Sequence, residues 1–143
     1  MDLSLKWDFK LDFSNHFMEF KMRGFWDDAE ADAFCVAFCK HVDELSEGGK
    51  RGFKVLIDAI DFPAQNESVR GRILKNMSYS VNNGLEKSAR IVSRSITELQ
   101  FRTLAKEVSS NLKAKNAQFG EFNSRAEALK WLELPGIQPP IPS

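Results

Sequence analysis

The first residues of the chain alternate strictly between apolar and polar side chains. From Leu3 to Phe13 every odd position is apolar, and the even positions carry serine, lysine or aspartate. Side chains on a β-strand point to opposite faces with a period of two residues. The segment is therefore predicted to be a strand with one buried face and one charged face. We expect the helices that cover such a sheet to lie mainly on its buried side.

A second alternating run follows the turn-forming residues 14–16. Its apolar positions are Met18, Phe20 and Met22, and its polar positions are Glu19, Lys21 and Arg23. Two alternating runs that are joined by a few residues predict an antiparallel hairpin.

The remainder of the chain alternates between helix-type and strand-type patterns. Capping-box patterns predict helix starts at Asp27, Ser95 and Ser124, and a further helix starts at Asn66 or Ser68. Strand-type segments occupy residues 53–58, 89–93 and 117–122. This order predicts an α/β fold with a single mixed five-stranded sheet of ββαβαβαβα order, in which parallel strands follow the hairpin. We expect one domain over residues 1–134 and a proline-rich tail over residues 135–143.

Composition excludes several classes of function. The 20 basic and 20 acidic residues of the 143-residue chain cancel, so we expect no nucleic-acid partner. No apolar run approaches the roughly 20 residues of a membrane-spanning helix, so we expect no membrane insertion. Two cysteines do not make a secreted disulfide framework, and the alternating strand begins too early for a signal peptide. These features favour a cytoplasmic protein.

Three segments carry a resemblance to a known family. They are residues 20–24 before the first predicted helix, residues 55–62 in and after the third predicted strand, and residues 122–132, where Glu127-Ala128 and Trp131-Leu132 lie in the last helix. With the order of elements, they resemble the SpoIIAA-like family, the STAS-type (anti-sigma-factor antagonist) domains, and within it a STAS/SEC14-like branch. The resemblance implies strands that follow in chain order, and a regulatory or ligand-binding role in place of catalysis.

Members of this family bind a partner kinase and are phosphorylated on a serine in an Asp-Ser-Ser-Gly-like loop at the start of the second helix. The corresponding segment here covers residues 61–68 and contains no Ser-Gly pair. Ser68 is its nearest matching hydroxyl and is therefore the phosphorylation candidate. A charge at this position would act through local electrostatics.

The same region supplies the candidate binding residues. Asp58 and Asp61 lie at or after the carboxyl end of the most apolar strand, where open α/β sheets place ligands. Asn66 and Ser68 then begin a helix whose free N–H groups suit an anion. Arg70 and Arg72 follow and would contact a phosphate if they face the same side. The alternative interpretation is ordinary helix capping beside solvated arginines.

Other chemically active residues favour structural roles. Cys35 and Cys39 share a helix face near His41, but a tetrahedral metal site has no evident fourth ligand, so core packing is favoured and no metal or cofactor is expected. The basic residues between positions 87 and 94 suggest the solvent side of a strand. Trp26, beside Phe25, belongs either to the core or to a partner surface.

Two functions remain open. The first is a non-catalytic regulatory or interaction module that binds a partner protein through the second helix and its preceding loop. The alternative is a small-molecule binding domain for a lipid or nucleotide, as in SEC14-like proteins. We expect no enzyme, because no nucleophile or acid–base constellation is present. A homodimer through the first strand also stays open, with Lys6 and Lys10 as edge-blocking charges in the alternative.

Overall fold

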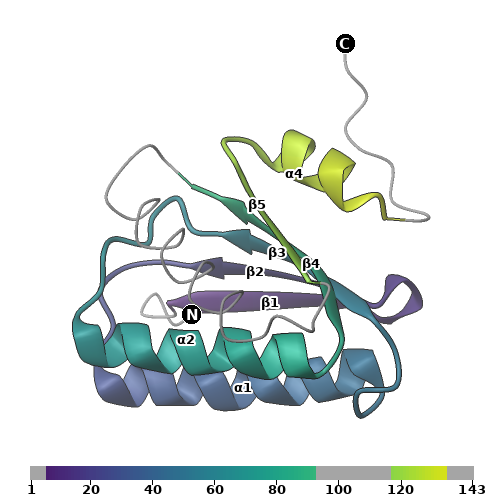
Figure 1. The fold of residues 1–143 in the computed structure, drawn as a ribbon. Helices are drawn as coiled ribbons and strands as arrows, with labels where there is room; N and C mark the ends of the chain where they lie inside the picture. Colours follow the sequence, from purple (N-terminus) through teal and green to yellow (C-terminus); the bar gives the residue numbers. More distant parts are fainter. Residues whose placement is uncertain (1–5, 93–116, 135–143) are drawn as a thin grey trace.

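The computed structural model describes residues 6–92 and 117–134. Five strands form the sheet: β1 (Trp7–Asp12), β2 (Phe17–Met22), β3 (Phe53–Asp58), β4 (Leu85–Ile91) and β5 (Gln118–Phe122). The helices of these residues are α1 (Asp28–Ser46), α2 (Glu67–Asn82) and α4 (Arg125–Leu132), with a short 3-10 helix, η1 (Phe13–Asn15), after β1 (Figure 1). None of these helices is long and apolar enough to cross a membrane. The helix predicted from Ser95 and the proline-rich tail lie outside the described residues.

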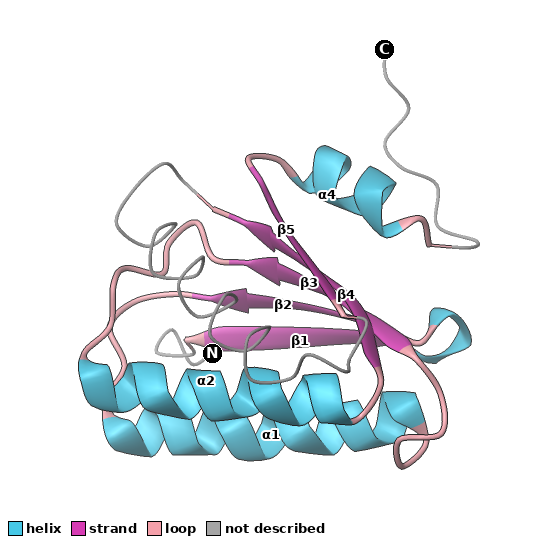
Figure 2. Cartoon of the chain, in the orientation of Figure 1, coloured by secondary structure: helices cyan, strands magenta, loops and turns pink. Residues whose placement is uncertain are grey.

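The strands lie side by side in chain order, β1-β2-β3-β4-β5 (Figure 2). β1 pairs with β2 in antiparallel orientation, and each later strand is parallel to its neighbour. The predicted fold class, a mixed five-stranded α/β sheet that starts with a hairpin, is therefore confirmed.

Local hydrogen bonds explain where the helices begin. The Asp27 carboxylate accepts from the Glu30 N–H at 2.7 Å, and the Glu30 carboxylate accepts from the Asp27 N–H at 2.9 Å, which completes the predicted capping box of α1. Asn66 begins α2, since its side-chain oxygen accepts from the Val69 N–H at 2.8 Å. Ser124 caps α4 in the same manner.

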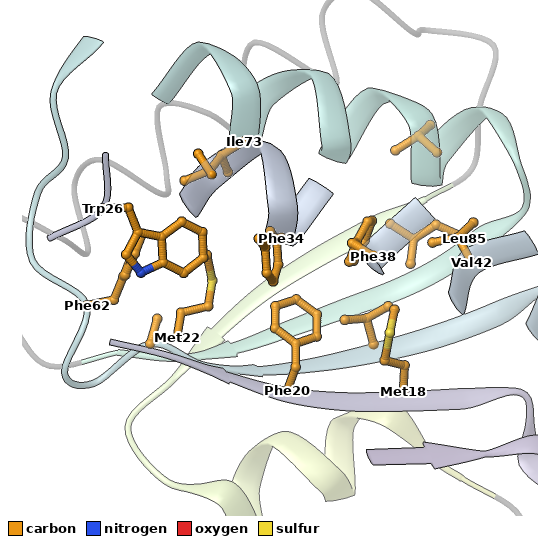
Figure 3. Close-up of a cluster of buried hydrophobic side chains, with 14 of the residues drawn as sticks. Met18, Phe20, Met22, Trp26, Phe34, Phe38, Val42, Phe62, Ile73 and Leu85 are labelled. Atoms are coloured by element: carbon orange, nitrogen blue, oxygen red, sulfur yellow. The ribbon is translucent and has the colours of Figure 1, made fainter. Parts of the chain in front are cut away.

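The main core lies between the sheet and the paired helices α1 and α2. Alternate residues of β2, namely Met18, Phe20 and Met22, point toward Phe34 and Phe38 on α1 (Figure 3). The two phenylalanines of α1 are four residues apart, so they occupy one face of the helix. Burial of each such side chain contributes about 1.5–3 kcal/mol relative to leaving it exposed. The alternation seen in the sequence therefore positions these two helices.

The last helix covers the opposite face of the sheet (Figure 1). Ala128, Leu129 and Leu132 of α4 pack there in a second apolar cluster with Leu56 and Ile91. This face is charged near the hairpin, but it is apolar where β3 and β4 meet α4. Among the described residues the layers are therefore unequal, with the long helices α1 and α2 on one side and the short helix α4 on the other.

Polar contacts hold α4 at both ends. The Arg125 guanidinium donates two hydrogen bonds of 2.8 Å to the Glu19 carboxylate on β2. At the other end, Lys54 Nζ donates to the Leu132 carbonyl at 2.7 Å, and Lys87 Nζ donates to the Trp131 carbonyl at 2.8 Å. Cations beside the last carbonyls of a helix complement its dipole.

β4 departs from the sequence prediction. It was expected over residues 89–93, whereas the strand extends from Leu85 to Ile91. The expectation that its basic residues mark a solvent face is wrong for Arg90, which is 2% exposed. In the register, Arg90 lies beside Ile57 of β3, on the face covered by α1 and α2. Ala89 and Ile91 point to the other face, against α4.

Candidate functional site

Two loops at the carboxyl ends of β2 and β3 are joined into one surface. The Gly24 N–H donates to the Asp61 carbonyl at 3.0 Å. The Gln65 side chain is 7% exposed and bridges the same loops: it accepts from the Trp26 N–H at 2.9 Å and donates to the Gly24 carbonyl at 3.0 Å. It also donates to the Pro63 carbonyl at 2.8 Å. We name residues 24–26 and 59–65 together the loop platform.

The loop platform presents two large apolar side chains to solvent. Phe25 is 70% exposed and Ile60 is 46% exposed. Their neighbours Trp26 and Phe62 point inward, where their rings pack edge to face at 5.0 Å between centroids. Trp26 therefore belongs to the core, and Phe25 belongs to the surface. Aromatic side chains are enriched at protein interfaces, and exposed apolar side chains that lie together mark such sites.

The two predicted aspartates lie beside the platform, with separate contacts. Asp58 accepts from the Ile60 N–H at 3.2 Å, and its carboxylate lies 3.9 Å from Lys21 Nζ on β2. The register places both residues on the face of the sheet that α4 covers. Asp61 is exposed and contributes its backbone carbonyl to the bond from Gly24.

The predicted residues of α2 are divided around the helix. Ser68 and Arg72 are one turn apart, and Arg72 Nη1 donates to Ser68 Oγ at 2.6 Å. Arg72 also reaches α1, where its Nε lies 2.6 Å from Asp32 and its Nη1 lies 3.3 Å from Asp28. The hydrogen bond to Asp32, followed by the charges of the two aspartates, raises the pKa of Arg72. Arg70 lies about 200° around the helix from Arg72, so the two arginines do not face one site.

The groove between α1 and α2 continues from these residues. It has a volume of about 550 Å³ and is lined by Cys35, Cys39, Arg72 and Tyr79 among others. Cys35 donates to the Arg72 carbonyl at 3.7 Å, and Cys39 donates to the Asn76 side-chain oxygen at 3.5 Å.

Both cysteines are half-buried free thiols. Burial raises the pKa of Cys35 to about 11, so this thiol is protonated at neutral pH. Within the ranges 6–92 and 117–134, no three His, Cys, Asp or Glu side chains form a group that could hold a metal ion.

A small cavity lies inside the domain, between the sheet and the layer of α1 and α2. Its volume is about 40 Å³, and its lining includes Phe38, Ile73, Asn76, Ser88 and Arg90. Burial lowers the pKa of Arg90 to about 10, against the opposing charge of Glu121, so the side chain stays charged at neutral pH. The Arg90 guanidinium also lies 5.5 Å from the centre of the Phe119 ring.

The sequence offered no signal for two of these features. Gln65 has a long polar side chain in a loop, which normally indicates a solvated residue. Arg90 belongs to a run in which lysine and arginine alternate with apolar residues, which is typical of a wet strand face. Phe25, by contrast, was recognisable as an aromatic residue after the end of a strand.

The described residues form an α/β fold whose strands follow in chain order, and the candidate site lies at the carboxyl ends of β2 and β3. No protein-family model and no curated protein matches the sequence. Among solved structures, the chain is similar to an uncharacterised protein of the DUF3478 family with a SpoIIAA-like fold, from Shewanella loihica PV-4. The TM-score is 0.64 at 17% sequence identity, covering 92% of this chain and 98% of that chain. The chain has a SpoIIAA-like fold, as the resemblance predicted.

Proposed function

We propose that this chain is a non-catalytic regulatory module of SpoIIAA-like (STAS) type, which binds a partner protein through α2 and the β3–α2 loop. We also propose that the protein is cytoplasmic. The loop platform is the observation that carries it. Phe25 and Ile60 are exposed, whereas the backbone beneath them is fixed by Gln65 and by the bond from Gly24 to Asp61. An anchored surface loses little conformational entropy when a partner binds.

The surroundings of the platform support binding over catalysis. The polar side chains beside the platform are engaged in structural contacts: Asn66 caps α2, Asp58 accepts from the Ile60 N–H, and Arg72 pairs with Asp28 and Asp32. Groups that already serve as caps and ion pairs are poorly placed to exchange protons with a substrate.

Ser68 is the proposed point of regulation. Its side chain is exposed and lies in the first turn of α2, where a phosphate is favoured by the helix dipole. Its Oγ already accepts a hydrogen bond from Arg72. A phosphate on Ser68 would compete with Asp32 and Asp28 for this guanidinium, and it would therefore change the contacts between α1 and α2 beside the platform.

Affinity capture from extracts of the native host tests the partner proposal. Wild type is compared with Phe25→Ser and with the matched control Phe13→Ser, since Phe13 is also exposed, at 54%, but lies in η1 at the other end of the hairpin. We expect a stoichiometric partner that is retained by the control and lost with Phe25→Ser. Equal retention by all three proteins would refute a site on the platform.

Ser68→Asp and Ser68→Ala test the regulatory step with that same partner. We expect Ser68→Asp to change its affinity by several-fold and Ser68→Ala to leave it near the wild-type value. Identical affinities for all three proteins would leave the platform proposal standing and remove the switch.

The alternative function, binding of a lipid or nucleotide, has the internal cavity in its favour, because it combines apolar walls with the charged Arg90. Its volume of about 40 Å³ is small beside the roughly 300–1,000 Å³ typical of ligand pockets. Native mass spectrometry of protein purified from its own host decides between the two functions. A retained small molecule supports the alternative, and a retained protein supports the interaction module.

A further inference from the structure

The outer edge of β1 has the properties of a pairing surface. β1 is the first strand of the sheet, and within the described residues no strand pairs with its far side. Its inward side chains Trp7, Phe9 and Leu11 pack against the core and are only partly buried. The Phe9 ring, for example, stacks on Phe34 at 5.5 Å between centroids. A strand edge with unpaired backbone groups and partly exposed apolar side chains favours the addition of another strand.

The register of the hairpin fixes which backbone groups are directed to this edge. The Arg23 N–H donates to the Lys6 carbonyl at 2.9 Å, and the register places these two residues directly opposite each other. Along an antiparallel ladder, residue pairs that exchange hydrogen bonds alternate with pairs that do not. Asp8, Lys10 and Asp12 therefore direct their N–H and C=O groups to β2. The odd residues Trp7, Phe9 and Leu11 direct theirs to the free edge.

We propose that a second copy of the chain pairs with this edge in antiparallel orientation, about a two-fold axis at Phe9. The two Phe9 residues then lie opposite each other, and Trp7 lies opposite the partner's Leu11. All of these residues direct their N–H and C=O groups outward, so the hydrogen bonds between the two strands can form without a bulge. The axis is perpendicular to the sheet, which places the helix layers of both copies on the same side.

The charges of β1 are complementary in this register. Asp8 faces the partner's Lys10, and Lys10 faces the partner's Asp8. Lys6 and Asp12 keep contacts within their own chain, with Glu30 and with Asn15. Asp8 and Lys10 are exposed, and they occupy the non-hydrogen-bonded positions, at which side chains of opposite strands approach most closely. Lysines on a strand edge usually oppose pairing. Here Lys10 meets Asp8 of the second copy, and Lys6 pairs with Glu30 of its own chain.

Other registers are disfavoured by the same residues. A slip that centres the axis on Lys10 brings two Lys10 side chains together and sets Asp8 against the partner's Asp12. A slip that centres it on Asp8 brings two aspartates together and sets Lys6 against the partner's Lys10. A slip of one residue opposes apolar side chains to charged ones. An axis on Trp7 or Leu11 also sets lysine against aspartate, but it pairs fewer residues of β1 (Trp7–Asp12). The arrangement about Phe9 therefore combines complementary charges with the longest overlap of the two strands.

A charge-exchange experiment tests the proposal on the full chain by sedimentation velocity over a range of protein concentrations. Asp8→Lys alone would set a second positive charge against the partner's Lys10, and Lys10→Asp alone would set two aspartates together. We expect each variant to dimerise roughly tenfold or more weakly than wild type, because two attractive pairs become repulsive. An equimolar mixture of the two variants restores opposite charges at both positions, so it should form heterodimers with nearly wild-type affinity.

The mixture separates dimer formation from damage within one chain. Each substitution also alters the contact with β2, where Asp8 faces Lys21 and Lys10 faces Glu19. That cost is the same in monomer, homodimer and heterodimer. Stronger dimerisation of the mixture than of either variant alone therefore reports contacts between the two copies. The control mixes Asp8→Lys with Lys75→Asp, a lysine exchange at an exposed position on α2 that leaves β1 unchanged. This heterodimer has one attractive and one repulsive pair, so it should form more weakly than the heterodimer of Asp8→Lys with Lys10→Asp.

The double variant Asp8→Lys/Lys10→Asp, which again has complementary charges, should recover the homodimer and serves if either single variant folds poorly. A wild-type chain that stays monomeric at all concentrations would overturn the proposal. So would a dimer that neither the mixture nor the double variant restores.

Discussion

Replacement of Gln65 by leucine is the most direct test of the loop platform. The substitution keeps a side chain of similar size and removes three hydrogen bonds of Gln65, two of which join the two loops. The Trp26 N–H is buried and loses its acceptor, at a cost of about 1–3 kcal/mol. The carbonyls of Gly24 and Pro63 each lose a bond of about 0.5–1.5 kcal/mol, which water replaces in part. We expect the free energy of unfolding to fall by about 2–4 kcal/mol.

Denaturant unfolding followed by tryptophan fluorescence measures this loss, since Trp26 lies in the affected loop. The matched control is Gln118→Leu, the same chemical change at an exposed position at the start of β5. A surface change of this kind should stay within about 0.5 kcal/mol of wild type. If Gln65→Leu also stays within that range, the bridge does not anchor the loops, and the argument for a fixed platform fails.

Three further predictions concern other parts of the domain. Tyr79, the single tyrosine of the chain, donates to Asp43 at 2.5 Å, which raises its pKa to about 12, so phenolate absorbance should appear at lower pH in Asp43→Asn. The hydrogen bond from Arg125 lowers the pKa of Glu19, so this contact stabilises the fold above the unfolded pKa and is lost as the pH falls through the folded pKa. Arg125→Gln should therefore destabilise the protein at neutral pH and match wild type in acid, as shown by unfolding over a pH series; a constant difference would contradict it. Leu56→Ala should lower the free energy of unfolding by about 2–5 kcal/mol, because Leu56 is fully buried under α4. The same substitution should speed hydrogen exchange in α4, and unchanged exchange there would count against this packing.

The elements that local chemistry specifies were predictable from the sequence. The strict alternation of apolar and polar residues in β1 and β2 identified the hairpin. The capping-box pair of Asp27 and Glu30 identified the start of α1. These signals depend on residues a few positions apart, so they are legible without the fold. The chain order of the sheet was expected from the resemblance to the SpoIIAA-like family, and the structure has this order.

Features that depend on distant contacts were not predictable. The start of β4 was missed because Leu85 follows Gly84 directly and precedes two charged residues, without an apolar run. Gln65 becomes structural only because the loop after β2 lies beside the loop after β3. The contact of Arg72 with Asp32 likewise depends on α1 lying beside α2.

The position of α4 has a consequence for the order of folding. Its last carbonyls are bound by Lys54 from β3 and Lys87 from β4, so the acceptor surface exists only once these two strands have paired. A helix of eight residues is too short to be stable by itself in water. Helix α4 should therefore assemble after the sheet, and in native protein it should detach before α1 and α2.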